Sequence, residues 1–133
     1  MIVLDASAAL ELLLNGPRAE GVAERAFADG ESLHAPHLID VEIAQVLRRL
    51  VRHSEIDPSR ATEAFADLRD LALTRYPHQM LLDGIWTLRD NVSAYDAAYV
   101  VLSLELGATL LTCDRKLSVV PVPGLVVELV GPS

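Results

Sequence analysis

The chain has 133 residues, of which 51% are hydrophobic and only 5% aromatic, so we expect one domain with a largely aliphatic core. Its formal charge of −8 argues against a protein that coats nucleic acid through a broad basic surface, but not against an enzyme whose bound cations supply positive charge locally. The single cysteine excludes an intramolecular disulfide, and neither a signal peptide nor an apolar stretch of about 20 residues is indicated, so we expect a cytoplasmic protein.

Alternating strand and helix patterns run along the whole chain. In chain order the expected elements are a strand at 1–4, helices at 7–14 and 18–28, a strand at 32–35, helices at 38–53 and 58–73, a strand at 74–76, helices at 78–89 and 93–106, and strands at 109–112 and 126–129. Asp57 and Pro58 are typical of a helix start, and Gly107 is typical of a helix end. Alternation of this kind predicts a parallel sheet that is covered on both faces.

Four acidic residues stand where such a fold can bring them to one point. Asp5 ends the N-terminal apolar run and Asp114 comes just after a later one, so each lies where a buried strand would stop. Glu42 and Asp96 lie on segments with helical patterns. Chemistry in an open α/β sheet gathers outside the carboxyl ends of the strands, where the strand order reverses. Four carboxylates there would bind hard divalent cations, which points to metal-assisted attack on a phosphodiester.

Each acid taken alone also has a structural explanation. Asp5 and Asp114 could each cap the helix or turn that follows, and Asp96 fits a variant capping box with Ser93. Glu42 could be a solvated residue on the flank of its helix. The joint arrangement favours a shared site, because two of the acids follow buried strands and a carboxylate held against a core surface needs a partner.

Two hydroxyl residues flank the acids that follow the strands. Ser7 lies two residues after Asp5, and Thr112 lies two residues before Asp114 on the same side of its strand. Their hydroxyls could orient carboxylates or waters, whereas capping for Ser7 and packing for Thr112 remain open as alternatives. Cys113 alternates to the opposite side, and we interpret it as a core residue.

Other groups of potentially reactive residues give weaker indications. The histidines lack the paired spacing of a zinc site, and we interpret all four as surface or cap residues. They are His34, His37, His53 and His78. The sequence also lacks a Gly-rich phosphate loop and a G-x-S-x-G motif. Three arginines between residues 48 and 52 are typical of a solvated helix face, with a phosphate-guiding role as the alternative.

Four motifs surround the acids and span nearly the whole chain in a fixed order. They are Ile2-Val3-Leu4-Asp5-Ala6-Ser7-Ala8, Asp40-Val41-Glu42, Ser93-Ala94-Tyr95-Asp96-Ala97-Ala98-Tyr99 and Leu110-Leu111-Thr112-Cys113-Asp114-Arg115-Lys116-Leu117. Together they resemble the PIN-domain ribonuclease family, and most closely the VapC-type toxins of type II toxin–antitoxin systems. One departure is Ala6, at a position where relatives often carry a hydroxyl residue.

This resemblance implies a fold, a cofactor and partners. It implies that residues 1–133 form a single PIN-like α/β domain, with a central parallel sheet of about five strands, helices on both faces, and the first strand beside the strand that precedes Asp114. It implies Mg²⁺ or Mn²⁺ bound by Asp5, Glu42, Asp96 and Asp114. The expected substrate is structured RNA, either transfer RNA or ribosomal RNA. The expected partners are a small antitoxin that occupies the acidic site and a second toxin copy in a homodimer.

The mechanism that we expect is in-line attack of water on the phosphodiester, assisted by one or two cations. A metal-dependent DNA nuclease remains an alternative, because such acids recognise the phosphate rather than the sugar. A catalytically silent acidic binding module is another. A phosphoacceptor receiver domain is disfavoured, because Asp5 stands alone and the strand at 74–76 has no Asp.

Overall fold

A five-stranded parallel sheet forms the centre of the computed structural model, which describes residues 1–132. The strand order is β3-β2-β1-β4-β5, and every neighbouring pair is parallel. The strands are β1 (Ile2–Leu4), β2 (Leu33–Pro36), β3 (Leu73–Tyr76), β4 (Thr109–Thr112) and β5 (Val127–Leu129). The α/β fold class and the parallel sheet predicted from the sequence are confirmed.

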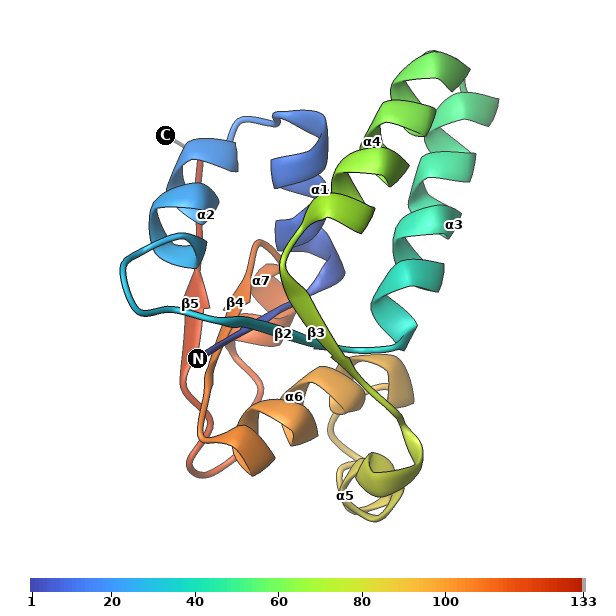
Figure 1. The fold of residues 1–133 in the computed structure, drawn as a ribbon. Coiled ribbons are helices and arrows are strands. Elements are labelled where there is room, and N and C mark those ends of the chain that lie inside the picture. The colour runs from blue at the N-terminus through green and yellow to red at the C-terminus, as the bar shows by residue number, and fades with distance from the viewer. Residues whose placement is uncertain (133) are drawn as a thin grey trace.

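Helices connect the strands and cover both faces of the sheet. They are α1 (Ala6–Leu14), α2 (Ala19–Ala26), α3 (Leu38–Arg52), α4 (Pro58–Asp70), the 3-10 helix η1 (Gln79–Leu81), α5 (Leu82–Thr87), α6 (Ala94–Leu106) and α7 (Arg115–Ser118). Figure 1 shows α1, α3 and α4 above the sheet and α5 and α6 below it. No helix among residues 1–132 is long and apolar enough to cross a membrane.

Strand β1 is at the centre of the sheet, and it is deeply buried together with its neighbour β4. All three residues of β1 have no exposed surface, and neither do Leu110 and Leu111 of β4. Such continuous burial is expected for parallel strands that helices cover on both faces. The chain moves from β1 outward to β2 and β3, and then returns to the other side of β1 to form β4 and β5. The strand order therefore reverses between β1 and β4, which leaves a crevice at their carboxyl ends.

Several expected helices differ from their predicted bounds, and the one expected at 18–28 spans only Ala19–Ala26. The helix expected at 58–73 ends at Asp70, because Leu71 is already extended and Leu73 pairs with Leu33 as the start of β3. The helix expected at 78–89 is divided into η1 and α5, and it ends at Thr87. Asp57 occupies the predicted cap position of α4, but its side chain accepts no capping hydrogen bond.

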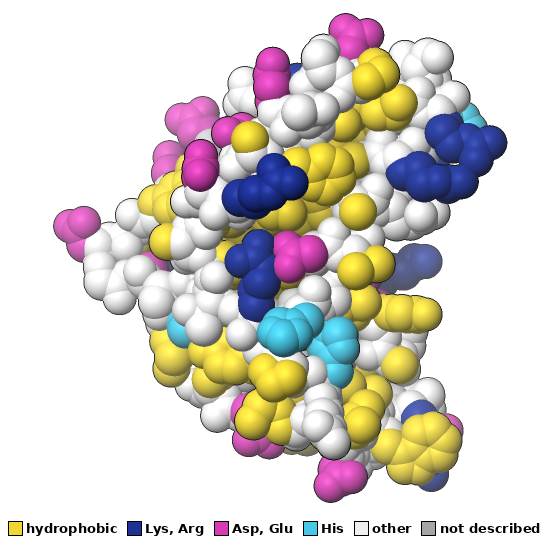
Figure 2. Space-filling model, turned by 45° about the vertical axis from the view of Figure 1, so that its right-hand side comes forward, with side chains coloured by type: hydrophobic (Ala, Val, Ile, Leu, Met, Phe, Trp, Pro, Cys, Tyr) yellow, Lys and Arg dark blue, Asp and Glu magenta, His cyan; other side chains and the backbone are white. Residues whose placement is uncertain are grey.

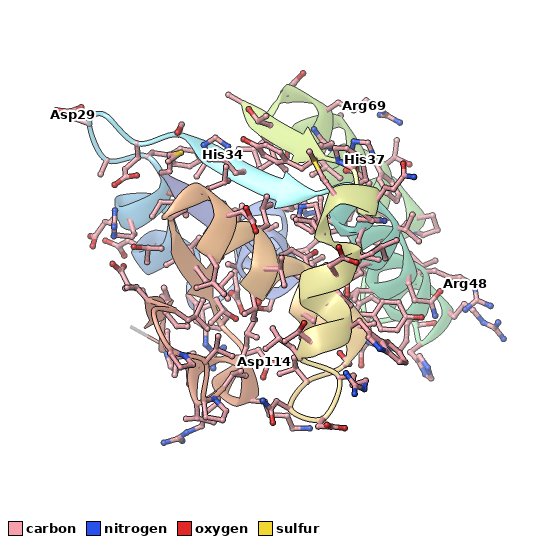
Figure 3. The ribbon with its side chains drawn as sticks, turned by 90° about the horizontal axis from the view of Figure 1, so that it is seen from below. Asp29, His34, His37, Arg48, Arg69 and Asp114 are labelled. Carbon is pink, nitrogen blue, oxygen red and sulfur yellow. The ribbon has the colours of Figure 1, made fainter. Side chains whose placement is uncertain are left out.

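The interpretation of His34 as a surface or cap residue is wrong. His34 lies on β2, as Figure 3 shows, and only 8% of its surface is exposed. Its two ring nitrogens are hydrogen-bonded to the Ser32 and Tyr76 hydroxyls, each at 2.7 Å. These two hydroxyls satisfy the polar ring inside the protein, so His34 can be buried without exposing its nitrogens to water. Burial lowers the pKa of His34 below its ordinary value.

Candidate active site

Asp5 stands at the junction of β1 and α1, and it is held in place by hydrogen bonds on both carboxylate oxygens. Its Oδ1 accepts from the Ser7 hydroxyl at 2.7 Å and from the Ala8 backbone N–H at 2.9 Å. Its Oδ2 accepts from the Thr112 hydroxyl of β4. The Ala8 bond is the helix cap expected for Asp5, and it satisfies one of the free N–H groups of the first turn. Asp5 is 5% exposed, so capping fixes it at the crevice rather than in open solvent.

Ser7 and Thr112 join the ends of β1 and β4 into one polar network. The Ser7 hydroxyl accepts a hydrogen bond from the Cys113 backbone N–H at 2.9 Å, while Thr112 Oγ1 accepts from the Asp114 backbone N–H at 2.9 Å. Both hydroxyls therefore connect Asp5 to the segment that carries Asp114. Cys113 is half-buried and packs against the core, and burial raises the pKa of its thiol to about 11.

Glu42 reaches the same crevice from the first half of α3. It is half-buried, and its Oε1 accepts a hydrogen bond of 2.6 Å from the Tyr99 hydroxyl of α6. Tyr99 itself is 2% exposed, so this bond ties α3 to α6 across the end of the sheet. Tyr99 stands inside the quoted motif around Asp96, but no role for it follows from the sequence. Tyr99 and Glu42 are 57 residues apart, so local spacing gives no signal of their contact.

Asp96 and Asp114 complete the acidic group from the starts of helices α6 and α7. Asp96 lies in the first turn of α6, and its backbone N–H donates to the capping Ser93 hydroxyl at 3.1 Å. Ser93 is thus the cap, and the Asp96 carboxylate accepts no hydrogen bond from any residue in 1–132. Asp114 caps α7 by accepting from the Lys116 N–H at 2.9 Å. Helix capping therefore explains part of the role of the Asp114 side chain, but it gives no role to the Asp96 carboxylate.

All four predicted acids line one small cavity. Its volume is about 110 Å³, and its wall is completed by Ala6, Ser7 and Tyr99. The walls belong to α1, α3, α6 and the segment that follows β4, which meet at the crevice between the central strands. Figure 3, a view from below, marks the position of Asp114, which belongs to this wall. The fold therefore brings together the four residues that stand far apart in the sequence.

The charge of this cavity is not balanced by the protein. Within the part of the chain that the structure describes, none of the four acids takes part in an ion pair. Burial raises the pKa of Asp5, Glu42 and Asp96 above their ordinary values. The Asp114 charge raises the Asp5 and Asp96 pKa further, while Thr112 and Tyr99 oppose the shifts of Asp5 and Glu42 by hydrogen bonding.

Carboxylate oxygens are the ligands that Mg²⁺ and Mn²⁺ prefer, so the chemistry of this donor set fits a hard divalent cation. As the side chains stand, however, no three His, Cys, Asp or Glu groups among residues 1–132 converge closely enough to hold an ion. The four acids line the cavity with negative charge, but they do not form a closed coordination shell.

Comparison with known proteins gives a consistent result over most of the chain. The PIN domain family matches residues 2–123. The chain is 48% identical over 118 residues to the VapC ribonuclease Mb0985 of Mycobacterium bovis, with 89% of each protein covered. It is 39% identical over 120 residues to ribonuclease VapC1 of Mycobacterium tuberculosis, with 90% of each covered.

Solved structures share the fold at lower identity. PAE2754 from Pyrobaculum aerophilum superposes with a TM-score of 0.72 at 20% identity, covering 95% of this chain and 82% of that one. VapBC2 from Rickettsia felis, bound to a DNA fragment from their promoter, superposes with a TM-score of 0.71 at 14% identity, covering 98% of this chain and 100% of that one. At these identities the likeness concerns the fold alone.

Proposed function

This chain belongs to the PIN-domain family, and we propose that it is an endoribonuclease dependent on Mg²⁺ or Mn²⁺ that acts as the toxin of a toxin–antitoxin pair. The observation that carries this proposal is the single cavity lined by Asp5, Glu42, Asp96 and Asp114 at the carboxyl ends of β1 and β4. Similarity to proteins named VapC ribonucleases supports RNA as the substrate.

The four carboxylates would hold the cations, and hydrogen bonds from the protein orient two of them, Asp5 and Glu42. Asp5 is fixed by hydrogen bonds from Ser7, Ala8 and Thr112 to its two carboxylate oxygens. Glu42 is oriented by Tyr99. The Asp96 carboxylate lacks a protein hydrogen bond among the described residues, so it can turn into the cavity to meet a ligand. Positioning residues of this kind fix ligand orientation in metal sites.

The chemistry that Mg²⁺ or Mn²⁺ supplies when bound is polarisation of the phosphodiester and activation of the attacking water. The protein holds the scissile phosphate beside the acids and aligns the attacking water opposite the leaving oxygen. One of the four carboxylates would accept the proton of that water.

Purified protein tests this proposal directly. We expect cleavage of transfer RNA or ribosomal RNA with Mg²⁺ or Mn²⁺, and we expect EDTA in excess of the metal to stop it. The same reactions on single-stranded and double-stranded DNA separate the ribonuclease from a metal-dependent DNA nuclease. Cleavage of DNA but not of RNA would replace the proposed substrate, and cleavage of neither would favour a silent acidic binding module. Mapping new RNA ends after brief induction in cells then identifies the RNA and the cut position.

The proposed antitoxin would inhibit by occupying the acidic cavity. A groove of about 620 Å³ adjoins this cavity, and it shares Ala6, Ser7 and Glu42 with its wall. Its remaining wall is mainly apolar and includes Leu10, Leu38, Val41 and Val46. An inhibitory segment with apolar side chains for the groove and an Arg for the carboxylates would fit both parts. Reversing the charge of that Arg should restore cleavage while the complex persists.

We also propose that the toxin forms a homodimer, as its similarity to VapC proteins suggests. Light scattering during gel filtration measures the mass in solution, and a mass near 14.4 kDa would exclude the dimer.

A further inference from the structure

Three arginines at the end of α3 form a group of cations without acidic partners. We call Arg48, Arg49 and Arg52 the α3 arginine patch. All three side chains are exposed, and within residues 1–132 none of them forms an ion pair or a hydrogen bond. Figure 2 shows basic side chains gathered over the upper end of α3, with no acidic side chain beside them on that face. Figure 3 shows Arg48 directed away from the body of the molecule.

Four of the other seven arginines of this acidic protein are paired with carboxylates, whereas the patch gathers three unpaired cations on one helix. Ion pairs are formed by Arg18, Arg25, Arg60 and Arg75. In a chain with a formal charge of −8, three adjacent cations that lack such partners create a local positive field. This field lies on the same helix as Glu42, and Arg49 also lines the groove that adjoins the acidic cavity.

Two hollows with shared lining residues lie between the acidic cavity and the patch. The groove that adjoins the cavity is lined by Ser7 and Glu42 at one end and by Gln45 and Arg49 further along α3. A second hollow, of about 340 Å³, shares Gln45 and Arg49 with that groove. Its other walls are Arg48, Arg52 and His53. The shared residues place the patch next in line after the groove along α3, so an extended ligand that leaves the cavity along this helix would meet the arginines.

Helix geometry sets the length of this path. Glu42, Gln45 and Arg49 lie on one face of α3, because residues three and seven positions apart stand above one another. At 1.5 Å of rise per residue, Arg49 lies about 10 Å and Arg52 about 15 Å from Glu42 along the axis. A stacked nucleic acid strand advances about 3.4 Å per nucleotide, so the path matches roughly four nucleotides.

We propose that the α3 arginine patch binds backbone phosphates of the RNA a few nucleotides from the scissile bond. This inference rests on the proposed ribonuclease function. Arginine suits the role because its planar guanidinium donates two parallel hydrogen bonds to a phosphate. The patch would hold RNA by sequence-independent contacts, while the acidic cavity, which repels phosphate until cations are bound, performs the cleavage. Helix-dipole stabilisation alone favours cations near a helix end, but it does not require them to line the path to the acids.

RNA binding in a cleavage-deficient background tests the patch. The parent protein is Asp5→Asn, and the test variant adds Arg48→Gln, Arg49→Gln and Arg52→Gln. A fluorescent RNA stem–loop is titrated in Mg²⁺ buffer over a range of KCl concentrations. We expect the triple variant to bind at least about 10-fold more weakly at low salt. The slope of log affinity against log salt should fall by about two, because about 0.7 counterions are released per phosphate contact on a single strand.

A control removes one arginine charge elsewhere and is matched to the single change Arg49→Gln. Arg69 is exposed in the last turn of α4 and has no ion pair among residues 1–132, so Arg69→Gln should bind RNA like the parent. The single change Arg49→Gln should give an intermediate loss, and this keeps the test decisive if the triple variant folds poorly. Equal binding and equal salt slopes for the parent and the patch variants would overturn the proposal.

Cleavage kinetics distinguish this inference from the underlying function. In the otherwise wild-type chain, the patch variants should raise KM and leave kcat nearly unchanged, because the contacts lie outside the reacting atoms. If the patch variants cleave RNA with an unchanged KM, the proposed RNA-binding role of the patch is wrong, but the ribonuclease function still stands. Loss of antitoxin binding without loss of RNA binding would reassign the patch to a protein partner. A wild-type protein that neither binds nor cleaves RNA would overturn both proposals.

Discussion

Thr112 is the residue that connects the two central strands at the candidate site. Its hydroxyl donates to Asp5 and accepts from the Asp114 N–H, and the side chain is fully buried. Thr112→Val keeps the shape but removes both bonds. We expect cation affinity to fall about 10- to 100-fold, as for other residues that orient metal ligands. We also expect a stability loss of about 1–3 kcal/mol from the unsatisfied buried groups.

The metal concentration that gives half-maximal cleavage measures this affinity. Thr109→Val is the control, because Thr109 lies on the same strand and its hydroxyl makes no hydrogen bond within residues 1–132. An unchanged metal requirement in Thr112→Val would show that the hydroxyl has no positioning role.

Asp96 should destabilise the metal-free protein at neutral pH. Burial and the Asp114 charge raise its folded pKa above the ordinary 3.8. Between 3.8 and the raised folded pKa the native state binds more protons than the unfolded state, so stability contributed by this group falls as pH rises through that window. Asp96→Asn removes the free-energy cost of keeping this carboxylate ionised in the folded protein. We expect the metal-free variant to be at least as stable as wild type at neutral pH, with the difference vanishing below pH 3.8.

Thermal melts with and without Mg²⁺ measure both consequences. Mg²⁺ should raise the melting temperature of the wild type by mass action and should do so less in Asp96→Asn. A variant that melts lower than wild type without metal, and that responds equally to Mg²⁺, would assign Asp96 to helix capping.

Individual contacts were the least predictable feature from sequence. The positions of Asp5 and Asp114 after buried strands can be predicted from the sequence, because strand patterns are local. The hydrogen bond between Glu42 and Tyr99 cannot be predicted from local sequence, because it joins helices that meet only in the folded chain. The burial of His34 was missed for the same reason, since its partner Tyr76 comes from the neighbouring strand β3.

Helix α3 carries Glu42 and the arginine patch, and its first turn is held by a side chain from another segment. The Leu38 N–H donates to His78 Nε2 at 2.8 Å, which satisfies a free donor of the helix start. His78→Ala should lower the free energy of unfolding by about 1 kcal/mol, as loss of a helix cap does. Urea denaturation measures this change. His53→Ala, at the exposed other end of α3, should have less than about half that effect. Equal losses in the two variants would contradict the capping role of His78.

Elements with clear local signals were predicted well, and their ends were set by tertiary contacts. Helix α6 begins after Ser93 and ends before Gly107, which adopts the expected left-handed conformation with a φ of 62°. Helix α4 carries a helical pattern beyond Asp70, but pairing of β3 with β2 ends it earlier. Local propensity is weaker than the hydrogen bonds that an edge strand gains from its neighbour.

At the scale of the whole molecule, strand order determines the site. The sequence could place two acids after strands, but their meeting depends on β1 and β4 being neighbours. That adjacency came from the family resemblance, because strand order is not encoded in local periodicity. The observed order places the reversal point between these strands, where ligands bind in open α/β sheets. The observed cavity shows that Glu42 and Asp96 also lie beside these two acids, which cannot be predicted from the sequence alone.

The central claim is that the four carboxylates act as one metal-dependent catalytic unit. Single-turnover RNA cleavage in Mg²⁺ tests it with Asp5→Asn, Glu42→Gln and their combination. Asp83→Asn is a control of equal charge change, because Asp83 lies in α5 outside the cavity wall. We predict that each single site variant loses about 100-fold or more in rate and that the double variant loses little further, because residues of one catalytic unit are not additive. Cleavage by Asp5→Asn at the wild-type rate, with the protein folded and metal present, would contradict the account.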